Sequence, residues 1–422
     1  MIPALVRLTS IFAALSILLI GHGLQQTALP VQAGALLWSP ATISLLGAAY
    51  FLGFILGSYR IPRWIRRVGH ARVFSACAGL AAAAVLGFGF SVEPAVWITL
   101  RVVTGFSFAG LYLVIESWLN TATPNERRGS VMSLYSLVSL LALIAGQFLA
   151  GVDLTTGISI VAIAFCLAIY PIALTGVEQP ETPHDVELSF QSTYRASQVA
   201  PMAAAVSGFV MGLAWSVGAV VTTERTDAGE AATDFMTYLL LGGACTLLPL
   251  GRLSDRVDRR LVVCGISLIG GLASLYACLH PISHSTSIII AFIVGATAMP
   301  LYSLAIAHAN DNADTDFLTI GGTLLVANGV GAVAAPLLYA ALSGTAVHPI
   351  LFFLLITTAF ATNTLWTGYR LTIHPVSRTF FEPFQAVSRT TLGAVELDPR
   401  ADHDAPSGAT TAEHNPITTG GR

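Results

Sequence analysis

The chain is dominated by long apolar stretches that alternate with short polar turns. A helix of about 20 apolar residues crosses a bilayer core about 30 Å thick. Lipid cannot satisfy exposed backbone groups, so stretches of this length are expected to span it as helices. Runs of this kind predict twelve membrane-spanning helices, at 8–30, 39–59, 73–92, 95–119, 130–152, 155–176, 200–222, 235–251, 261–281, 286–308, 317–341 and 346–369.

Composition supports the same fold class, an all-α integral membrane protein. Only 10% of the residues are charged and 54% are hydrophobic, whereas a soluble domain carries about a quarter charged residues. The net charge of −3 gives no basic surface for nucleic acid. The five cysteines all lie inside apolar runs, so we expect neither a disulfide framework nor a metal site.

The first apolar run has an alternative interpretation, because Arg7 precedes it as in a secretory signal peptide. The run is long, however, and it ends in GHGLQQ rather than in a small-residue cleavage site. These two features favour a membrane-spanning helix.

Arginines mark one side of the predicted bundle. The loops after the second, fourth, sixth and eighth runs contain Arg60, Arg63, Arg66, Arg67, Arg72, Arg127, Arg128, Arg195, Arg252, Arg256, Arg259 and Arg260. The opposite loops offer only Arg225. Basic loops stay in the cytoplasm, so we expect both termini on the cytoplasmic side of the membrane.

The polar stretches divide the chain into four parts. Residues 177–199 carry prolines and charges between the sixth and seventh runs and predict a linker. We therefore expect an N-terminal six-helix bundle over 1–176 and a C-terminal bundle over 200–370. Residues 371–422 gain Pro, Thr, Gly and Asp, a composition that predicts a disordered cytoplasmic tail.

The two predicted halves share an arginine-rich turn. Arg67-Val68, after the second run, aligns with Arg256-Val257, after the eighth. A duplicated bundle would leave such a match at corresponding places. The second copy, GRLSDRVDRR (251–260), resembles the signature loop of the major facilitator superfamily, and Arg101-Val-Val-Thr-Gly105 resembles the arginine motif of its fourth helix.

Further motifs extend this resemblance across the membrane region. GHGLQQT, RVGHAR, ESWLN followed by RRG, and LYSLAIAHAND resemble one bacterial subgroup of these carriers. The resemblance implies two pseudo-symmetric six-helix bundles, a monomeric secondary carrier of a small solute, and no cofactor. The first-half loop departs from the pattern at Pro62 and Arg66, and Gly146-Gln147 replaces the glycine-proline of the antiporter motif.

Only two permanently ionisable residues lie inside the apolar runs, Arg101 and Glu116. A charge at membrane depth costs on the order of 3 kcal/mol, so each needs a partner or a watery cavity. Together with Gly105, Phe108 and Tyr112 they form one stripe along a helix. Arg101 either binds an anionic substrate, modulates a proton site, or bonds backbone carbonyls as a structural group.

Glu116 lies near the cytoplasmic end of its run, and the resemblance assigns it to a cytoplasmic gate rather than to proton carriage. Its expected partners are Arg66, Arg67, Arg127 or Arg128. In the second half, Asp255 and Arg256 are expected to form the matching gate with the 308–317 loop. That loop supplies His308, Asn310 and Asp311.

His22, Gln25 and Gln26 share one face of the first helix. They either contact substrate, with His22 able to titrate near neutral pH, or hydrogen-bond to neighbouring helices. The second half has no charge at depth, so its substrate contacts are expected to be neutral or aromatic, with core packing as the alternative. The full set of candidate substrate-binding residues is His22, Gln25, Gln26, Arg101, Tyr112, Gln147, Trp215 and Tyr302.

The sequence therefore favours a secondary transporter that works by alternating access. Proton-coupled efflux is one mode of transport that is compatible with it. HExxH, GxSxG and nucleotide-binding loops are absent from the sequence, so an enzyme or an ATP-driven pump is not expected. Two alternatives remain: a transport-inactive sensor or assembly protein with the same fold, and a membrane-embedded enzyme using His22 and Glu116. The distance between these two residues along the bilayer normal disfavours the enzyme.

Overall fold

The computed structural model describes residues 2–124, 127–175, 180, 188–223, 228–311, 317–344, 349–373, 384 and 390. Within them every regular element is helical. The first half contains α1 (Ile2–Ala35), α2 (Pro40–Val68), α3 (His70–Gly87), α4 (Pro94–Ala122), α5 (Arg128–Gln147), α6 (Leu154–Leu167) and α7 (Ile169–Thr175). A short helix, α8 (Phe190–Ala196), lies within the predicted linker. The second half contains α9 (Ala200–Leu213), the π-helix η2 (Ala214–Gly218), α10 (Ala219–Thr223), α11 (Ala228–Ser254), α12 (Arg259–Leu279), α13 (His284–Asn310), α14 (Phe317–Leu342) and α15 (Pro349–Ile373).

The described residues contain 12 helical segments long and apolar enough to cross a membrane, which confirms the predicted number. The sixth is formed by α6 and α7, and the seventh by α9, η2 and α10. The predicted boundary of the second span was wrong, because α2 continues past residue 59 to Val68. Its last turns are polar on the surface yet bury Ile61 and Ile65, so hydropathy alone ends the span too early.

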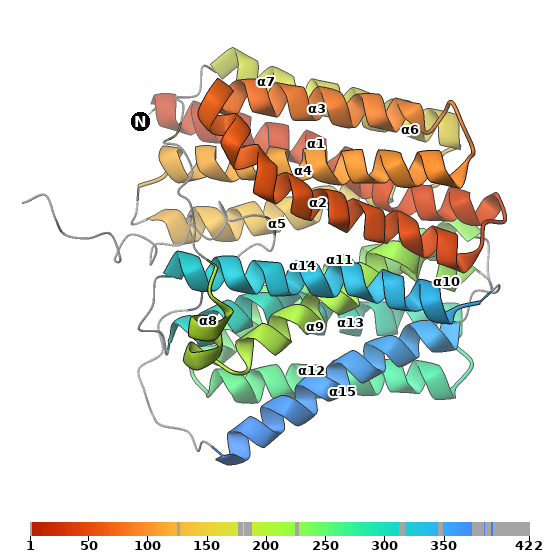
Figure 1. The fold of residues 1–422 in the computed structure, drawn as a ribbon, viewed down its shortest axis with the longest axis vertical. Helices are drawn as coiled ribbons and strands as arrows, with labels where there is room; N and C mark the ends of the chain where they lie inside the picture. Colours follow the sequence, from red (N-terminus) through yellow and green to blue (C-terminus); the bar gives the residue numbers. More distant parts are fainter. Residues whose placement is uncertain are drawn as a thin grey trace, which may run out of the picture.

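The two halves repeat the same pairing of helices (Figure 1). In the first half α2 packs on α4, α1 on α5, and α3 on α6. In the second half α11 packs on α13, α9 on α14, and α12 on α15, which are the pairs at the same positions in the order of spans. This correspondence is the structural form of the repeat that the arginine-rich turns indicate.

Glycines allow the tightest of these pairs. A Cβ added at Gly105 would lie 2.0 Å from the carbonyl oxygen of Tyr50, and one at Gly53 would lie 2.0 Å from that of Val102, so α2 and α4 touch backbone to backbone. Gly242 and Gly295 do the same between α11 and α13. Close approach through small residues is the usual way for helices to associate in lipid.

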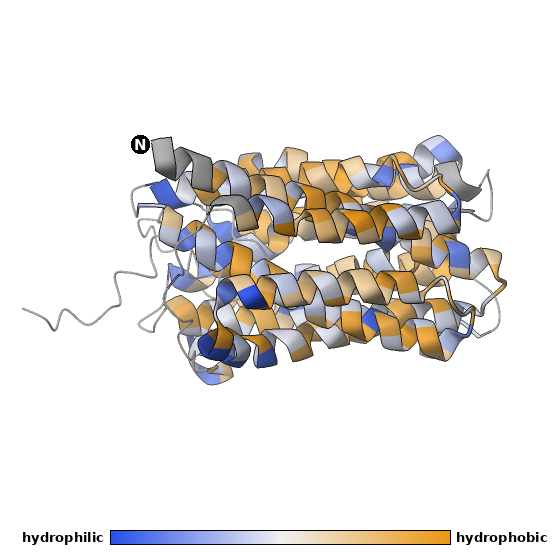
Figure 2. Cartoon of the chain, turned by 90° about the horizontal axis from the view of Figure 1, so that it is seen from above, coloured by the Kyte–Doolittle hydropathy of each residue, from blue (hydrophilic) through white to orange (hydrophobic). Residues whose placement is uncertain are grey.

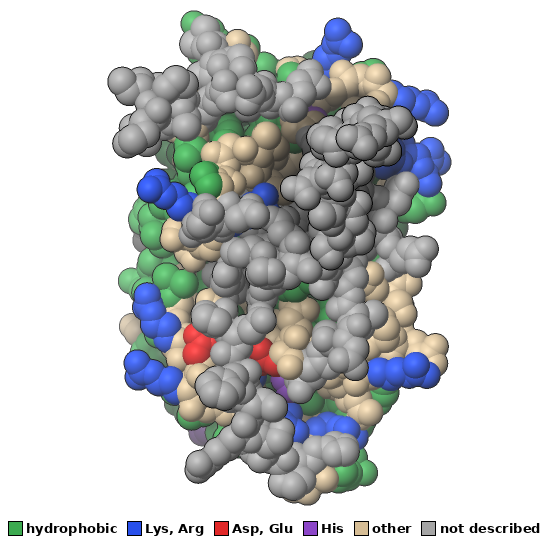
Figure 3. Space-filling model, turned by 90° about the vertical axis from the view of Figure 1, so that its left-hand side faces the viewer, with side chains coloured by type: hydrophobic (Ala, Val, Ile, Leu, Met, Phe, Trp, Pro, Cys, Tyr) green, Lys and Arg blue, Asp and Glu red, His purple; other side chains and the backbone are tan. Residues whose placement is uncertain are grey.

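Polar residues gather at the two ends of the bundle, whereas apolar residues cover the helices between them (Figure 2). One end carries arginines around its rim (Figure 3). They lie in the last turns of α2 and α11, just after α4 or α11, or in the first turns of α3, α5 and α12, so the topology brings them to the same end. We call this the arginine-rich end and the other the opposite end.

Capped turns separate the spans. The Ser39 hydroxyl accepts a hydrogen bond from the Thr42 N–H at 3.2 Å, and an Asp153 carboxylate oxygen accepts one from the Thr156 N–H at 3.0 Å. The bonds from Thr156 lower the pKa of Asp153. Between α2 and α3 the whole turn is Gly69, whose φ of 85° favours glycine. These caps satisfy backbone groups where the helices end.

We predict that Gly105→Ala destabilises the protein, because its methyl group would push α2 and α4 apart. Overpacking of this kind costs about 1–3 kcal/mol. Thermal unfolding in detergent should show a lower melting temperature for this variant. Gly79→Ala in α3 is the matched control, since its added Cβ meets no atom within 4 Å. Equal melting temperatures for the two variants would contradict the backbone contact.

Candidate functional site

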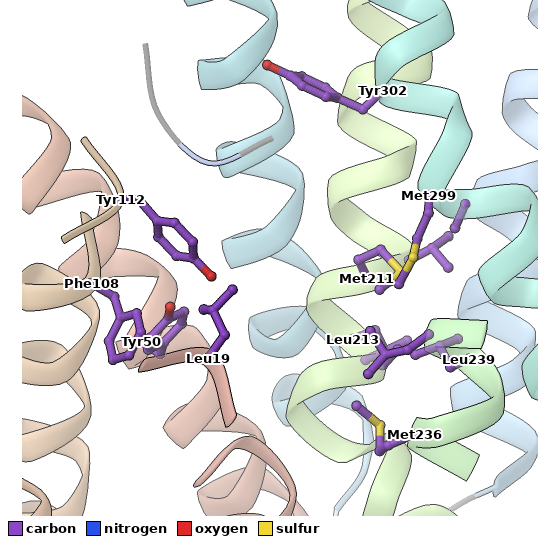
Figure 4. Packing of buried hydrophobic residues seen from close by; sticks show 14 of the residues in the cluster. Leu19, Tyr50, Phe108, Tyr112, Met211, Leu213, Met236, Leu239, Met299 and Tyr302 are labelled. Atoms are coloured by element: carbon purple, nitrogen blue, oxygen red, sulfur yellow. The ribbon is translucent and has the colours of Figure 1, made fainter. Parts of the chain in front are cut away.

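A cavity of about 780 Å³ lies between the two halves. Its first-half wall includes His22, Gln26, Tyr50, Tyr112 and Ser136, and its second-half wall includes Met211, Trp215, Leu240, Met299 and Tyr302. Figure 4 shows Tyr50 and Tyr112 on one side, with Met211, Met299 and Tyr302 on the other. The cavity therefore belongs to neither half alone.

The cavity extends toward the arginine-rich end. Its lining reaches Ser58 and Tyr59 near the end of α2, Ser136 near the start of α5 and Gly322 near the start of α14. At the opposite end the two halves touch directly. The Ser44 hydroxyl donates to the Pro336 carbonyl at 2.7 Å, and Gly47 packs against Ser216 so closely that a Cβ would overlap it.

The wall is uncharged and uneven in polarity. Among the described residues that line the cavity, none is Asp, Glu, Lys or Arg. The first-half wall presents an imidazole, an amide and phenol groups beside phenylalanine and leucine side chains, whereas the second-half wall is mainly apolar, with Tyr302, Ser303 and Asn328 as polar exceptions. A solute with one polar and one apolar side would match this division.

Arg101 lies directly behind the polar wall, and its side chain is buried. Its Nη2 donates to Gln26 Oε1 at 2.5 Å, and its Nε donates to the Leu46 carbonyl at 3.4 Å. The guanidinium also stands 4.7 Å from the centre of the Tyr50 ring, a cation–π contact. Arg101 bonds a backbone carbonyl, the contact expected of a structural arginine, and it also contacts two wall residues without lining the cavity itself.

His22 lines the cavity and is fixed by three neighbours. Its ring stacks on Phe108 with centroids 3.9 Å apart. Its Nε2 lies 3.3 Å from Gln26 Nε2 and 3.2 Å from the Tyr50 hydroxyl. His22, Gln26, Tyr50 and Arg101 therefore form one connected polar cluster, which we call the α1–α2–α4 cluster.

The other predicted substrate-binding residues fall into two groups. Tyr112, Trp215 and Tyr302 line the cavity together with His22 and Gln26. Gln25 and Gln147 do not line it. Gln147 instead ties α5 to α1, accepting from the Thr27 hydroxyl at 2.5 Å and donating to the Gly23 carbonyl at 3.0 Å.

Tyr50, Met211 and Met299 also line the cavity, but they were not predicted. Tyr50 could have been found, because its hydroxyl is a polar group within the second apolar run. The two methionines carry no such signal, since they are equally suited to a hydrophobic core.

Glu116 is fully buried toward the arginine-rich end of α4. It accepts hydrogen bonds from the Tyr135 hydroxyl at 2.7 Å and from the Thr390 hydroxyl. Of its expected partners, Arg67 and Arg127 are exposed and Arg128 is half-buried. The hydroxyl partners were not predicted.

In the second half the expected pairing is corrected. Arg256 is exposed in the turn after α11, and Arg259 takes the place predicted for it. Arg259 Nε lies 2.5 Å from Asp311 Oδ2, and Arg259 Nη2 lies 3.3 Å from Asp255 Oδ1. Asp258 caps α12, so Arg259 is the first residue of that helix and faces back onto α11 and α13.

Asp258 itself is paired with Arg260. Its Oδ2 lies 2.7 Å from Arg260 Nη2, and its Oδ1 accepts from the Arg260 N–H at 2.8 Å. Burial of the carboxyl opposes ionisation, but the hydrogen bonds from Arg260 outweigh it and hold the pKa of Asp258 below its ordinary value. The cap is therefore ionised at neutral pH.

The predicted tail lies outside the described residues except for 371–373, Phe384 and Thr390. The Phe384 N–H donates to Asp255 Oδ1 at 2.8 Å, and its ring lies close to Gly251. Thr390 lines the cavity as well as contacting Glu116. These two residues touch opposite halves at the arginine-rich end.

Comparison with known proteins gives the family. A family model described as Major Facilitator Superfamily matches residues 11–222, half of the chain. The chain belongs to the major facilitator superfamily. It is therefore a multi-pass membrane transporter by family and not an enzyme.

Curated relatives agree with this assignment. An uncharacterized MFS-type transporter of Enterobacter sp. (strain 638) is 23% identical over 333 residues, covering 75% of this chain and 84% of the relative. The uncharacterized MFS-type transporter YcaD of Salmonella heidelberg (strain SL476) is 24% identical over 328 residues, with the same two coverages of 75% and 84%. The predicted resemblance to a bacterial subgroup of these carriers is thereby confirmed.

Solved structures share the fold at low sequence identity. A bacterial homologue of the human lysosomal transporter Spinster, inward-facing and occupied, has a TM-score of 0.65 at 15% identity and covers 94% of this chain and 96% of its own. The nucleoside transporter NupG has a TM-score of 0.64 at 10% identity, covering 88% and 100%. This likeness confirms the expected fold class, an all-helical fold with twelve candidate membrane spans in the described residues.

The second-half ion pair gives a stability prediction. Asp311→Asn should lower the melting temperature, because removing one partner of a buried pair costs about 3 kcal/mol or more when the other charge stays buried. Asp255, also near Arg259, will offset part of that cost. Asp234→Asn is the control, since Asp234 pairs with His284 where both side chains are more than a third exposed. A melting temperature for the Asp311 variant equal to that of the control would contradict the pair's role.

Proposed function

We propose that this protein is a secondary active transporter that carries a small amphipathic solute by alternating access. The observation that carries the proposal is the cavity between the halves, which extends to one end of the bundle while the halves touch at the other. Rocking of the halves about such a cavity would expose it to the other side. The energy would come from an ion or solute gradient, and the active unit would be a monomer.

The walls favour an amphipathic solute without a strong formal charge. The cavity volume of about 780 Å³ falls within the usual range for small-molecule sites, about 300–1,000 Å³. Its lining offers hydrogen-bonding groups from His22, Gln26 and Tyr50, but no carboxylate among the described residues to pair with a cation. Trp215, on the facing wall, provides a flat apolar surface and lies in η2. Short π-helical turns often occur at functional sites.

The arginine-rich end is assigned to the cytoplasm. Basic residues remain on the cytoplasmic side of a membrane, and those of this chain collect at one end (Figure 3). With an even number of spans, both termini would lie on that side of a bacterial inner membrane. The described conformation would then be inward-facing.

A proton is the coupling ion that we propose. Among the described residues that line the cavity, His22 carries the imidazole, a group that can bind and release a proton. A fold neighbour, the E. coli fucose:proton symporter FucP, has a TM-score of 0.52 at 13% identity and couples its solute to protons by its printed name. Either direction of solute movement is compatible with this coupling.

The test is a thermal-shift screen of the purified protein against a solute library, followed by flux of each hit in proteoliposomes. A solute that binds only the folded protein raises its melting temperature. We expect amphipathic hits that cross the bilayer faster with protein than without it. The proposal is wrong if no hit is carried in liposomes that contain folded, correctly inserted protein.

A matched pair of tryptophan variants locates the site. Trp215→Ala should weaken binding of the hits at least tenfold, because it removes aromatic surface from the cavity wall. Trp64→Ala is the control, since Trp64 is 45% exposed on the surface of α2 and does not line the cavity. The two variants are compared by titrating each hit and recording the melting temperature. Equal losses in both variants would contradict binding in this cavity.

A further inference from the structure

The α1–α2–α4 cluster has only one arrangement of hydrogen-bond donors that fits its geometry. A guanidinium group has donors and no acceptor. The Gln26 atom that lies 2.5 Å from Arg101 Nη2 must therefore be the amide oxygen, as found. Arg101 thus fixes which way the Gln26 amide points.

The orientation of Gln26 then fixes the state of His22. The amide nitrogen of Gln26 faces His22 Nε2 at 3.3 Å, and an amide nitrogen can only donate. The Tyr50 hydroxyl lies 3.2 Å from the same ring nitrogen and can donate to it as well. Nε2 must accept, so in this conformation it carries no proton, and His22 is neutral with its hydrogen on Nδ1.

Among the described residues, no acidic side chain contacts the His22 ring. The titratable or charged groups that face this ring are Tyr50 from α2, with Arg101 and Tyr112 from α4. From α5 and α6 the neighbours of α1 in this region are Gln147 and Phe165, which do not titrate. In the described part of the chain no carboxylate bonds to the cluster. Glu116 lies further along α4, about 22 Å from Arg101 at about 1.5 Å per residue.

We propose that His22 is the proton-binding site of the carrier and that Gln26 links its protonation to Arg101. The inference rests on the proposed function, because it specifies the coupling site of that carrier. A proton from water in the cavity would bind the lone pair of Nε2 and add one positive charge to the ring. The new N–H would then face the Gln26 amide N–H, so the amide must turn and take its oxygen away from Arg101.

This link gives the conformation a defined place in the transport cycle. His22 lines the cavity, which extends to the arginine-rich end, so a proton leaving Nε2 is released toward that end. The proton-free ring is then held by Gln26 and Tyr50. Binding a proton breaks the Gln26–Arg101 bond, which is one of the contacts between α1 and α4, the stacking of His22 on Phe108 being another. The arrangement described is therefore the proton-released state.

The proposal can be tested on the full chain in lipid nanodiscs by ¹⁵N NMR of labelled histidine, whose ring nitrogens differ in shift with and without a proton. The chain has ten histidines, so His22→Gln identifies the signal of His22 by its loss. At pH 7.5 we expect a bare Nε2 and a protonated Nδ1. On lowering the pH, Nε2 should gain its proton with the same midpoint at which the Arg101 side-chain signal, assigned through Arg101→Lys, changes.

Gln26→Glu replaces the amide N–H that faces His22 with a carboxylate oxygen, while the side chain keeps nearly the same shape. A carboxylate can accept from Arg101 and from His22 but cannot donate, so His22 in this variant should carry a proton on Nε2 at pH 7.5. Gln147→Glu is the control, because Gln147 is also fully buried against α1 but bonds Thr27 and the Gly23 carbonyl rather than Arg101 or His22. It should keep the bare Nε2.

Three results would overturn the proposal: a protonated Nε2 in the wild type at pH 7.5, separate midpoints for His22 and Arg101, or a bare Nε2 in folded Gln26→Glu protein. The wild-type measurement decides the first two even if the Glu variant does not fold. The readout follows one ring in the protein without solute. The NMR result can therefore contradict the proton site while solute is still carried, or support it while no solute moves. The two outcomes are independent, so this test is distinct from the test of transport.

Discussion

The burial of the Arg101 guanidinium is the constraint on which the first half depends. A charge at membrane depth is costly unless polar groups surround it. Here those groups come from α1, through Gln26, and from α2, through the Leu46 carbonyl and the Tyr50 ring. Separating any of these helices would leave the guanidinium with fewer partners. The three helices are therefore expected to move as one body.

The second half has its own internal ties, placed differently. Arg259 joins the start of α12 to Asp311 at the end of α13 and to Asp255 beside α11. Between the halves, by contrast, the described contacts at the opposite end include a hydroxyl on a carbonyl and a glycine against a serine. Strong ties within each half and uncharged contacts between them suit two bodies that rock against each other. The cavity walls would then change their exposure while each wall keeps its shape.

The sequence predicted the parts of this structure that hydropathy and charge determine. The twelve spans follow from the thickness of a bilayer, and the arginines of the turns collect at one end because the spans alternate in direction. Arg101 and the His22–Gln26 face were identified because polar groups at depth need an explanation. The pairing of Arg101 with Gln26 was not predicted, since it joins residues on different helices and depends on how those helices pack.

Other features could not be inferred because the same type of residue, in a similar stretch of sequence, can have different roles. Met211 and Met299 line the cavity, yet methionine in an apolar run is equally common in a core. Arg256 and Arg259 stand in the same basic cluster, and only the cap at Asp258 decides that Arg259 turns inward. Gln147 was expected at the substrate and instead ties α5 to α1. In each case the deciding factor is how the helices begin and pack together, which residue types alone do not show.

The central claim is that two bodies rock about the cavity and that a proton at His22 biases the motion. Distances between two spin labels, measured by double electron–electron resonance in lipid, test this claim directly. The labels are attached to pairs of cysteines introduced into a variant that lacks the native cysteines. One label pair replaces exposed Arg72 and Arg252 at the arginine-rich end, and the other replaces exposed Leu37 and Leu279 at the opposite end. At pH 8 the first pair should be mainly far apart and the second mainly close. At pH 6 a population with both distances reversed should grow, and fixed distances for both pairs at both pH values would contradict the account.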